Sequence, residues 1–191
     1  MKKTMAVVGV VLGLMAGSAN AAVLTYSALL APEQVGATGT GSATVTIDDL
    51  SNTMRVIASF SGLSGNTTVA HIHCCTAVPM TGTAGVATTT PSFAGFPAGV
   101  PSGNYDRTFD LTDSSSWRAG FITASGGTTA GAQAALLTGL TANSAYFNIH
   151  TSAYTGGEIR GFFVADVPLP GTVALLGLGL VGIGAARRKQ A

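Results

Sequence analysis

Short segments that alternate between apolar and polar residues recur along the middle of this chain, and they constrain its fold more than any other feature. They cover residues 42–47, 54–60, 67–73, 104–111, 146–151 and 158–164. Successive side chains of a β-strand point to opposite faces of the sheet, so each segment predicts a strand. Gly, Asn and Asp separate several of these segments and are typical of turns. The pattern therefore predicts a mainly β domain with many turns.

Three further segments break the alternation. Asp113 and the serines that follow it offer N-caps for a short helical turn reaching residue 122, and the Ala-rich segment 130–137 predicts a helix that ends near Gly139. Residues 76–103 hold four of the seven prolines and predict a long exposed excursion with one short strand at 85–90. We therefore expect one or two short helices beside the strands.

The first 21 residues have the pattern of a secretory signal peptide. The basic start Met1–Lys3 leads into an apolar run over 5–16 and then into Ala19-Asn20-Ala21, which has the small residues of a cleavage site. We expect cleavage between Ala21 and Ala22, so that the domain covers residues 22–166.

A second apolar block lies near the C-terminus. Residues 172–186 would form about 22 Å of helix, which is short against a hydrocarbon core of about 30 Å. The basic residues Arg187, Arg188 and Lys189 follow directly and would stay on the cytoplasmic side of a membrane. The block predicts a transmembrane helix, with the domain on the other side of the membrane.

This end, residues 167–191, resembles the PEP-CTERM sorting signal of exported proteins of Gram-negative bacteria. The resemblance is carried by Pro168, Pro170 and Gly171 before the apolar block and by the basic residues after it. Leu169 stands where the usual motif has Glu. The resemblance implies an inner-membrane-anchored intermediate, an exosortase-type processing enzyme as partner, and a final place at the cell surface or in the extracellular matrix. The alternative is a plain C-terminal anchor.

The charge of the domain excludes one class of function. Residues 22–166 contain no lysine and four arginines against eight acidic residues, which gives a net charge of −4. Nucleic-acid binding needs a basic surface, so no nucleic-acid partner is expected.

All three histidines of the chain lie in alternating segments. His71 and His73 share one face of the first, and Asn148 and His150 share one face of the second. If the two strands are neighbours with these faces on one side, the three imidazoles lie together. Two uses of such a cluster remain open: a structural polar network, or a single copper or zinc site built from His71, His73 and His150.

The structural alternative draws on neighbouring polar residues. Glu158 and Arg160 are expected on one face of their strand and, with Asn148, would join the histidines in a polar network in which the guanidinium binds a carboxylate.

Cys74 and Cys75 follow His73 directly. In an oxidising compartment they form a vicinal disulfide, pair between molecules, or bind metal beside His73, and otherwise they remain free thiols. The disulfide is the slightly favoured alternative.

Residues 24–165 resemble the CHRD domain, a module first defined in chordin and common in exported bacterial proteins. The matching segments are 59–63, 70–73, 146–151 and 156–161. The resemblance implies a β-rich extracytoplasmic domain without an established biochemical role.

A more distant similarity to Cu,Zn superoxide dismutase rests on Gly62-Leu63 and the His-x-His strand. It implies a Greek-key-like antiparallel sandwich or barrel and suggests the copper alternative, although three histidines are too few for a dinuclear site of that type.

No catalytic triad or nucleophile motif is recognisable in the sequence. We therefore expect a non-enzymatic structural or binding module of the cell envelope, with exopolysaccharide or envelope components as partners.

Overall fold

The computed structural model describes residues 23–166, which form eight strands, two α-helices and one 3₁₀ turn. The predicted signal peptide 1–21, the predicted cleavage site between Ala21 and Ala22, and the segment 167–191 with the predicted sorting motif and transmembrane helix lie outside the described residues. In chain order the elements are β1 (Val23–Pro32), β2 (Thr40–Asp48), β3 (Thr53–Ser61), β4 (Thr67–His73), β5 (Gly103–Asp110), the 3₁₀ turn (Ser114–Ser116), α1 (Ala119–Ala124), α2 (Thr129–Thr141), β6 (Tyr146–Thr151), β7 (Ile159–Phe162) and β8 (Val164–Ala165).

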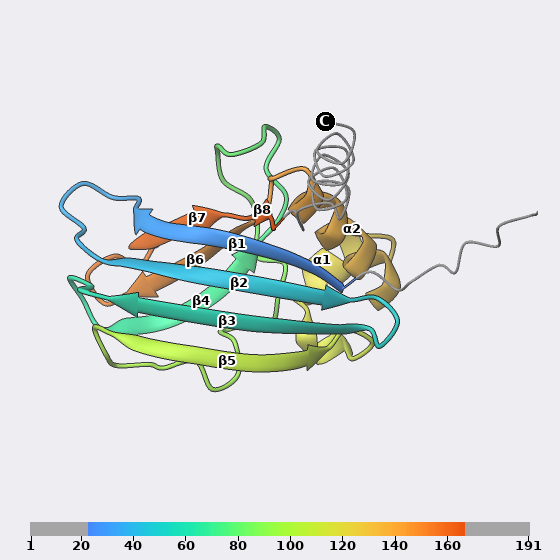
Figure 1. Ribbon diagram of the computed structural model, residues 1–191, viewed down its shortest axis with the longest axis horizontal. Helices are drawn as coiled ribbons and strands as arrows, with labels where there is room; N and C mark the ends of the chain where they lie inside the picture. The colour runs from blue at the N-terminus through green and yellow to red at the C-terminus, as the bar shows by residue number, and fades with distance from the viewer. Residues whose placement is uncertain (1–22, 167–191) are drawn as a thin grey trace, which may run out of the picture.

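The strands form one curled antiparallel sheet with the order β4-β6-β7-β1-β2-β3-β5, and β8 pairs with β1 (Figure 1). Strand β1 joins the two halves of the sheet. Its residues 23–30 pair with β2, whereas Ala31 and Pro32 pair with Arg160 and Ile159 of β7. The sheet therefore bends at the end of β1 into a half-barrel, which confirms the predicted mainly β, antiparallel architecture.

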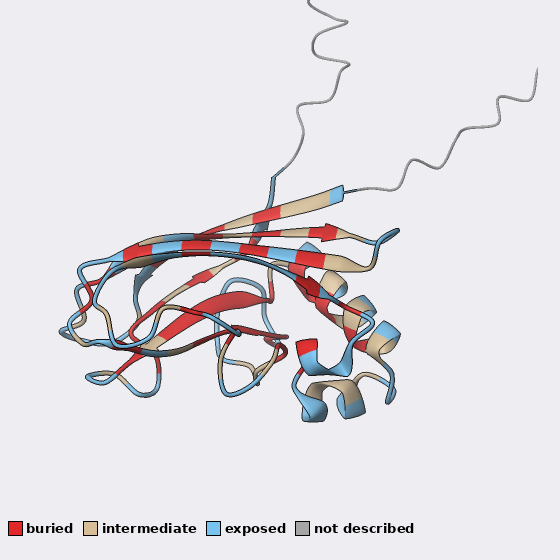
Figure 2. Ribbon diagram, turned by 90° about the horizontal axis from the view of Figure 1, so that it is seen from below, coloured by how far each residue is buried: buried red, intermediate tan, exposed pale blue. Residues whose placement is uncertain are grey.

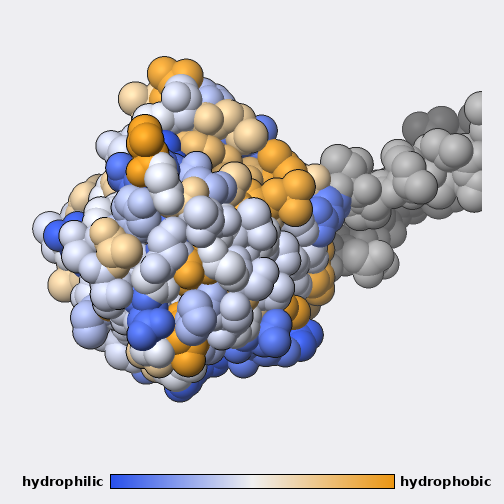
Figure 3. Space-filling view, turned by 90° about the vertical axis from the view of Figure 1, so that its left-hand side faces the viewer, coloured by the Kyte–Doolittle hydropathy of each residue, from blue (hydrophilic) through white to orange (hydrophobic). Residues whose placement is uncertain are grey.

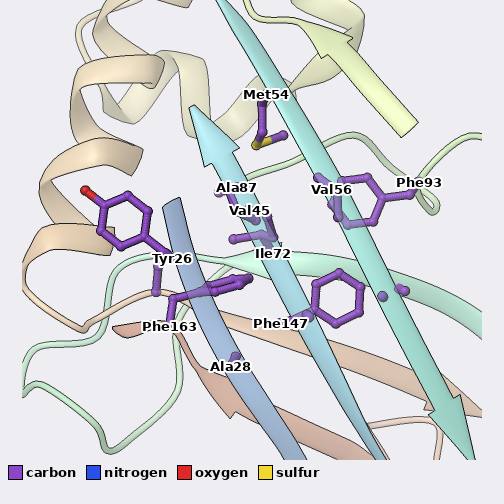
Figure 4. Packing of buried hydrophobic residues seen from close by; sticks show 14 of the residues in the cluster. Tyr26, Ala28, Val45, Met54, Val56, Ile72, Ala87, Phe93, Phe147 and Phe163 are labelled. Carbon is purple, nitrogen blue, oxygen red and sulfur yellow. The ribbon is translucent and has the colours of Figure 1, made fainter. Parts of the chain in front are cut away.

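The bend creates two layers that bury an apolar core between them. Figure 2 shows buried residues in the strands of both layers. In Figure 4, Val45 and Val56 of one layer lie above Ile72 and Phe147 of the other, and all four are fully buried. Phe93, from the excursion after β4, stacks on Phe147 with ring centroids 5.9 Å apart. The excursion therefore contributes to the core as well as to the surface.

The helices lie together at one end of the sheet (Figure 1). Helix α2 starts at the N-cap Thr128, whose side chain accepts a hydrogen bond from Gly131 N. Among residues 23–166, no helix has both the length and the apolar character needed to span a membrane. The opposite end of the molecule has a largely hydrophilic or neutral surface on which apolar residues form small separate groups (Figure 3).

Several predicted boundaries differ from the structure. Strand β1 was not predicted from the sequence. Residues 85–90 form isolated bridges, which pair Val86 with His73 and Thr88 with Trp117, instead of a strand. Helix α2 continues past Gly139 to Thr141. Gly139 lies against the sulfur atoms of Cys74 and Cys75, where a Cβ would collide with both. Gly139 thus permits a close approach and does not end the helix.

The two-layer core predicts different effects for two isoleucines of the same sheet. Ile47 is 1% exposed and Ile57 is 37% exposed. We expect Ile47→Ala to lower the free energy of unfolding by about 2–5 kcal/mol, because it removes buried methyl groups and leaves a cavity. The matched Ile57→Ala change should lower it by about 1 kcal/mol or less. Denaturant unfolding of both variants measures the difference, and equal losses would contradict the burial described above.

Candidate metal centre

The pairing of β4 with β6 brings the three histidines onto one face. Residue Val69 pairs with His150, His71 with Asn148, and His73 with Tyr146. Directly paired residues of an antiparallel sheet point to the same side. The intervening residues, including Ile72 and Phe147, point into the core. One ring nitrogen from each histidine therefore lies within 4.8 Å of those of the other two.

Each imidazole is held by a backbone carbonyl of a neighbouring loop. The bonds join His71 Nε2 to Pro91 O, His73 Nδ1 to Ala84 O at 2.9 Å, and His150 Nδ1 to Thr155 O at 2.8 Å. A carbonyl oxygen can only accept, so the bonded nitrogen must carry the proton. When the ring is neutral, its other nitrogen therefore carries a free lone pair, which is the state in which histidine binds metals.

The second ring nitrogens are buried and face one another. His71 Nδ1, His73 Nε2 and His150 Nε2 have no hydrogen-bond partner within residues 23–166. The ring centroids are 5.5 to 6.1 Å apart. Burial lowers the pKa of His71 to about 4, and it also lowers the pKa of His73. Nearby His150 lowers both values further, whereas the bonds to Pro91 and Ala84 oppose the shift. His71 and His73 are thus neutral at pH 7.

Tyr146 and Glu33, which the sequence did not single out, complete the surroundings of the histidines. Tyr146 stacks on His73 with ring centroids 4.8 Å apart, and the Arg160 guanidinium lies over the Tyr146 ring, 5.2 Å from its centroid. Arg160 Nε is 3.0 Å from Glu33 Oε2, and its Nη1 donates to Gly82 O. The alternation that places Asn148 and His150 on one face also includes Tyr146. No sequence signal connects Glu33 to the site.

Of the predicted network, Asn148 and Arg160 lie beside the histidines, whereas Glu158 does not. Asn148 pairs directly with both His71 and Arg160 across the sheet. Glu158 precedes β7 and instead accepts hydrogen bonds from Ser64 N, Gly65 N and Thr151 Oγ1. Burial raises the pKa of this carboxyl, but these hydrogen bonds outweigh it and leave the pKa below its usual range. The carboxylate partner of Arg160 is therefore Glu33 and not Glu158, because Glu158 joins the turn at 64–65 to the end of β6.

Cys74 and Cys75 form a disulfide in the structure. Their sulfur atoms lie against α2, where Cys75 Sγ is 3.7 Å from Ala135 O and both sulfurs border Gly139. Within the described part of the chain, the one group of three or more histidine, cysteine or acidic side chains suited to a metal consists of His71, His73 and His150. The disulfide thus lies next to this group in sequence but is not one of its members.

The lowered pKa of His71 predicts a pH dependence of the metal-free protein. The unfolded chain takes up the proton near the ordinary value of 6.5, whereas the folded protein takes it up only near 4. Stability is therefore complete above about pH 6.5 and is lost as the pH falls from 6.5 toward 4, by roughly 3 kcal/mol in all, of which roughly 2 kcal/mol is lost between pH 7 and 5. Denaturant unfolding with a chelator present, between pH 7 and 5, measures this slope above the range in which carboxyl groups titrate.

The matched variant is His71→Gln. Its side-chain amide can donate to Pro91 O in place of Nε2 and does not titrate. We expect a clearly shallower slope between pH 7 and 5, with the remainder due to His73, whose pKa is also lowered. An unchanged slope would show that His71 does not carry the effect.

Comparisons with known proteins agree with both parts of the chain. The model of the CHRD domain matches residues 21–163, and that of the PEP-CTERM protein-sorting motif matches residues 166–189. No curated protein and no solved structure gives a significant match. The sorting motif implies export and membrane-anchored processing by an exosortase in a Gram-negative bacterium. The chain belongs to the CHRD domain family, as an exported member that is sorted through its C-terminal end.

Proposed function

We propose that this exported protein is a non-enzymatic metal-binding module of the cell envelope, which holds one copper or zinc ion between His71, His73 and His150. One observation carries the proposal: three buried ring nitrogens converge, and each lacks a hydrogen-bond partner among the described residues. Imidazole nitrogen is a preferred donor for both metals.

The spacing of the nitrogens suits an ion after a small adjustment. Zinc–nitrogen bonds of about 2.0–2.1 Å place two tetrahedral ligands about 3.4 Å apart. The nitrogens of the three histidines lie within 4.8 Å of one another, so side-chain shifts of about 1 Å bring them to bonding distance. The bonds to Ala84, Pro91 and Thr155 hold the proton of each neutral imidazole on the loop-facing nitrogen, so that the metal-facing nitrogen keeps the lone pair that a ligand needs.

A purely structural network explains these nitrogens less well. Each metal-facing nitrogen is an acceptor, and acceptors cannot bond to one another. Leaving a buried polar atom without a partner costs about 1–3 kcal/mol. A bound cation supplies a partner to all three nitrogens at once, which a network of neutral imidazoles cannot do.

Metal titration of the protein purified from its envelope fraction tests this proposal. We expect one Cu²⁺ or Zn²⁺ per chain by elemental analysis and native mass spectrometry. His73→Asn and His150→Asn keep an amide donor for the loop carbonyl but remove the metal-facing nitrogen. We expect each variant to bind at least about 100-fold more weakly, because one of three protein ligands is lost.

Asp106→Asn is the control for adventitious binding, because Asp106 is an exposed carboxylate paired with Arg55 on another part of the sheet. It should leave the stoichiometry and the affinity unchanged. A wild-type protein that takes up no ion, or histidine variants that bind as tightly as wild type, would refute the metal site.

We also propose that processing releases the module from the membrane to the cell surface or extracellular matrix, where it meets exopolysaccharide or envelope components. The support is the sorting motif over residues 166–189, whose apolar block is followed by basic residues that would remain on the cytoplasmic side.

Intact mass of the surface fraction measures the processing. The mature chain should lack Arg187, Arg188 and Lys189, whereas cells without the exosortase should retain them. A surface-located chain that still carries all three residues would contradict this route.

A further inference from the structure

The position of Asn148 relative to the histidines is the starting point. On β6, Asn148 shares its face with Tyr146 and His150, and it lies directly opposite His71 on β4. His73 pairs with Tyr146, and His150 pairs with Val69, so the two histidines stand on either side of the His71–Asn148 pair along the strands. Their ring centroids are nevertheless only 6.1 Å apart. The three rings therefore lie close together on the face of the sheet that also carries Asn148.

Asn148 is buried and its carbonyl oxygen lacks a partner. The residue is 3% exposed, and no atom within residues 23–166 forms a hydrogen bond with its Oδ1. The same holds for Glu33 Oε1, the oxygen that does not face Arg160. These two oxygens and the three histidine nitrogens are the only buried side-chain nitrogen or oxygen atoms without a hydrogen bond in the described part of the chain.

Gly157 shows that the two oxygens share one small space. A Cβ on Gly157 would lie 2.6 Å from Asn148 Nδ2 and 2.7 Å from Asn148 Oδ1, and it would collide with Glu33 Oε1. Gly157 also has φ +124°, a conformation that other residues rarely adopt. The amide of Asn148 and the carboxylate of Glu33 thus meet beside this glycine, while Arg160 holds the carboxylate from the other side at 3.0 Å.

We propose that Asn148 Oδ1 is the fourth donor to the ion held by His71, His73 and His150, and that it makes the site selective for Cu²⁺ and Zn²⁺ over Cu⁺. This inference rests on the proposed function. Asn148 Nδ2 then donates to Glu33 Oε1, which turns the carbonyl oxygen toward the histidines. Every buried atom in this group gains a partner in that arrangement, the three nitrogens and Oδ1 from the ion and Glu33 Oε1 from the amide.

The selectivity follows from the donor atoms. A carbonyl oxygen is a hard ligand and suits divalent ions, whereas Cu⁺ is selected by soft sulfur ligands. The cysteine sulfurs nearest in sequence are bonded to each other and lie against α2. Three nitrogens and one oxygen therefore remain as donors, a set that favours divalent ions.

The test compares three ions on the mature protein. Dissociation constants for Zn²⁺, Cu²⁺ and Cu⁺ are measured by competition with chelators, with ascorbate as the reductant for Cu⁺ and the thiol content checked. Asn148→Leu fills a similar volume without the oxygen. We expect it to weaken Zn²⁺ and Cu²⁺ binding by about 10–100-fold and to change Cu⁺ binding by less than about 3-fold.

Asn148→Asp is the second variant, because it keeps an oxygen in the same place. It should bind Zn²⁺ at least as tightly as wild type and should change the Cu²⁺ electron paramagnetic resonance spectrum. It also keeps the inference testable if the leucine variant does not fold, which thermal unfolding of the metal-free proteins will show. An unchanged Cu²⁺ spectrum in Asn148→Asp would overturn the assignment.

Glu33 is a positioning residue, and its variants separate that role from folding alone. Glu33→Leu should weaken Zn²⁺ binding, and Glu33→Gln should restore part of it, because a glutamine carbonyl can still accept from Asn148 Nδ2. Equal weakening in both variants would contradict the positioning role.

The outcomes also distinguish this inference from the proposed function. Equal loss of all three ions in Asn148→Leu, or no loss of any, would refute the fourth donor while histidine-dependent binding in the wild type still stands. A wild-type protein that binds none of the three ions would refute both.

Discussion

The register between β4 and β6 is the constraint on which the candidate site depends. A slip of one residue would turn His71 and His73 into the apolar core and Ile72 out of it, because the side chains of a strand alternate. The inner face opposes this slip, since Ala70 and Ile72 of β4 and Phe147 and Ile149 of β6 are all completely buried. The free energy of core burial therefore fixes the positions of the three imidazoles, and the site needs no separate scaffold.

The loops around this strand pair then fix the orientation of each ring. The excursion after β4 follows the free edge of that strand, with hydrogen bonds from Ala87 N to Ile72 O and from Phe93 N to Ala70 O. Because Phe93 belongs to the core, the carbonyls of Ala84 and Pro91 are held in place to receive the histidine N–H groups. The turn after β6 does the same for His150 through Thr155 O. The three rings are thus oriented by packing that extends well beyond the site.

Alternation in the sequence was enough to predict β2 to β6, the segment that holds β7 and β8, and the faces on which His71, His73 and His150 lie. It predicted neither β1 nor which strands are neighbours. The two histidine segments are more than seventy residues apart, and nothing in either specifies the other as its partner. Every residue has a backbone carbonyl, so the residue types could not show which carbonyls would hold the rings. The prediction that placed Glu158 beside Arg160 was wrong. Residues 158 and 160 point to the same face only if both belong to the strand, and β7 begins at Ile159. Glu33 is brought to the site only by the bend at the end of β1.

The same features bear on how this weakly charged domain would gather the proposed cation. Residues 22–166 carry a net charge of −4, which raises the local concentration of cations around them at low ionic strength. That field does not discriminate among metals, so selection must come from the donor atoms. Oxidation of Cys74 and Cys75 to a disulfide removes both thiolates from competition, and the remaining converging donors are imidazole nitrogens beside an amide oxygen. An export pathway that leads to an oxidising compartment would therefore also determine which ions the proposed site prefers.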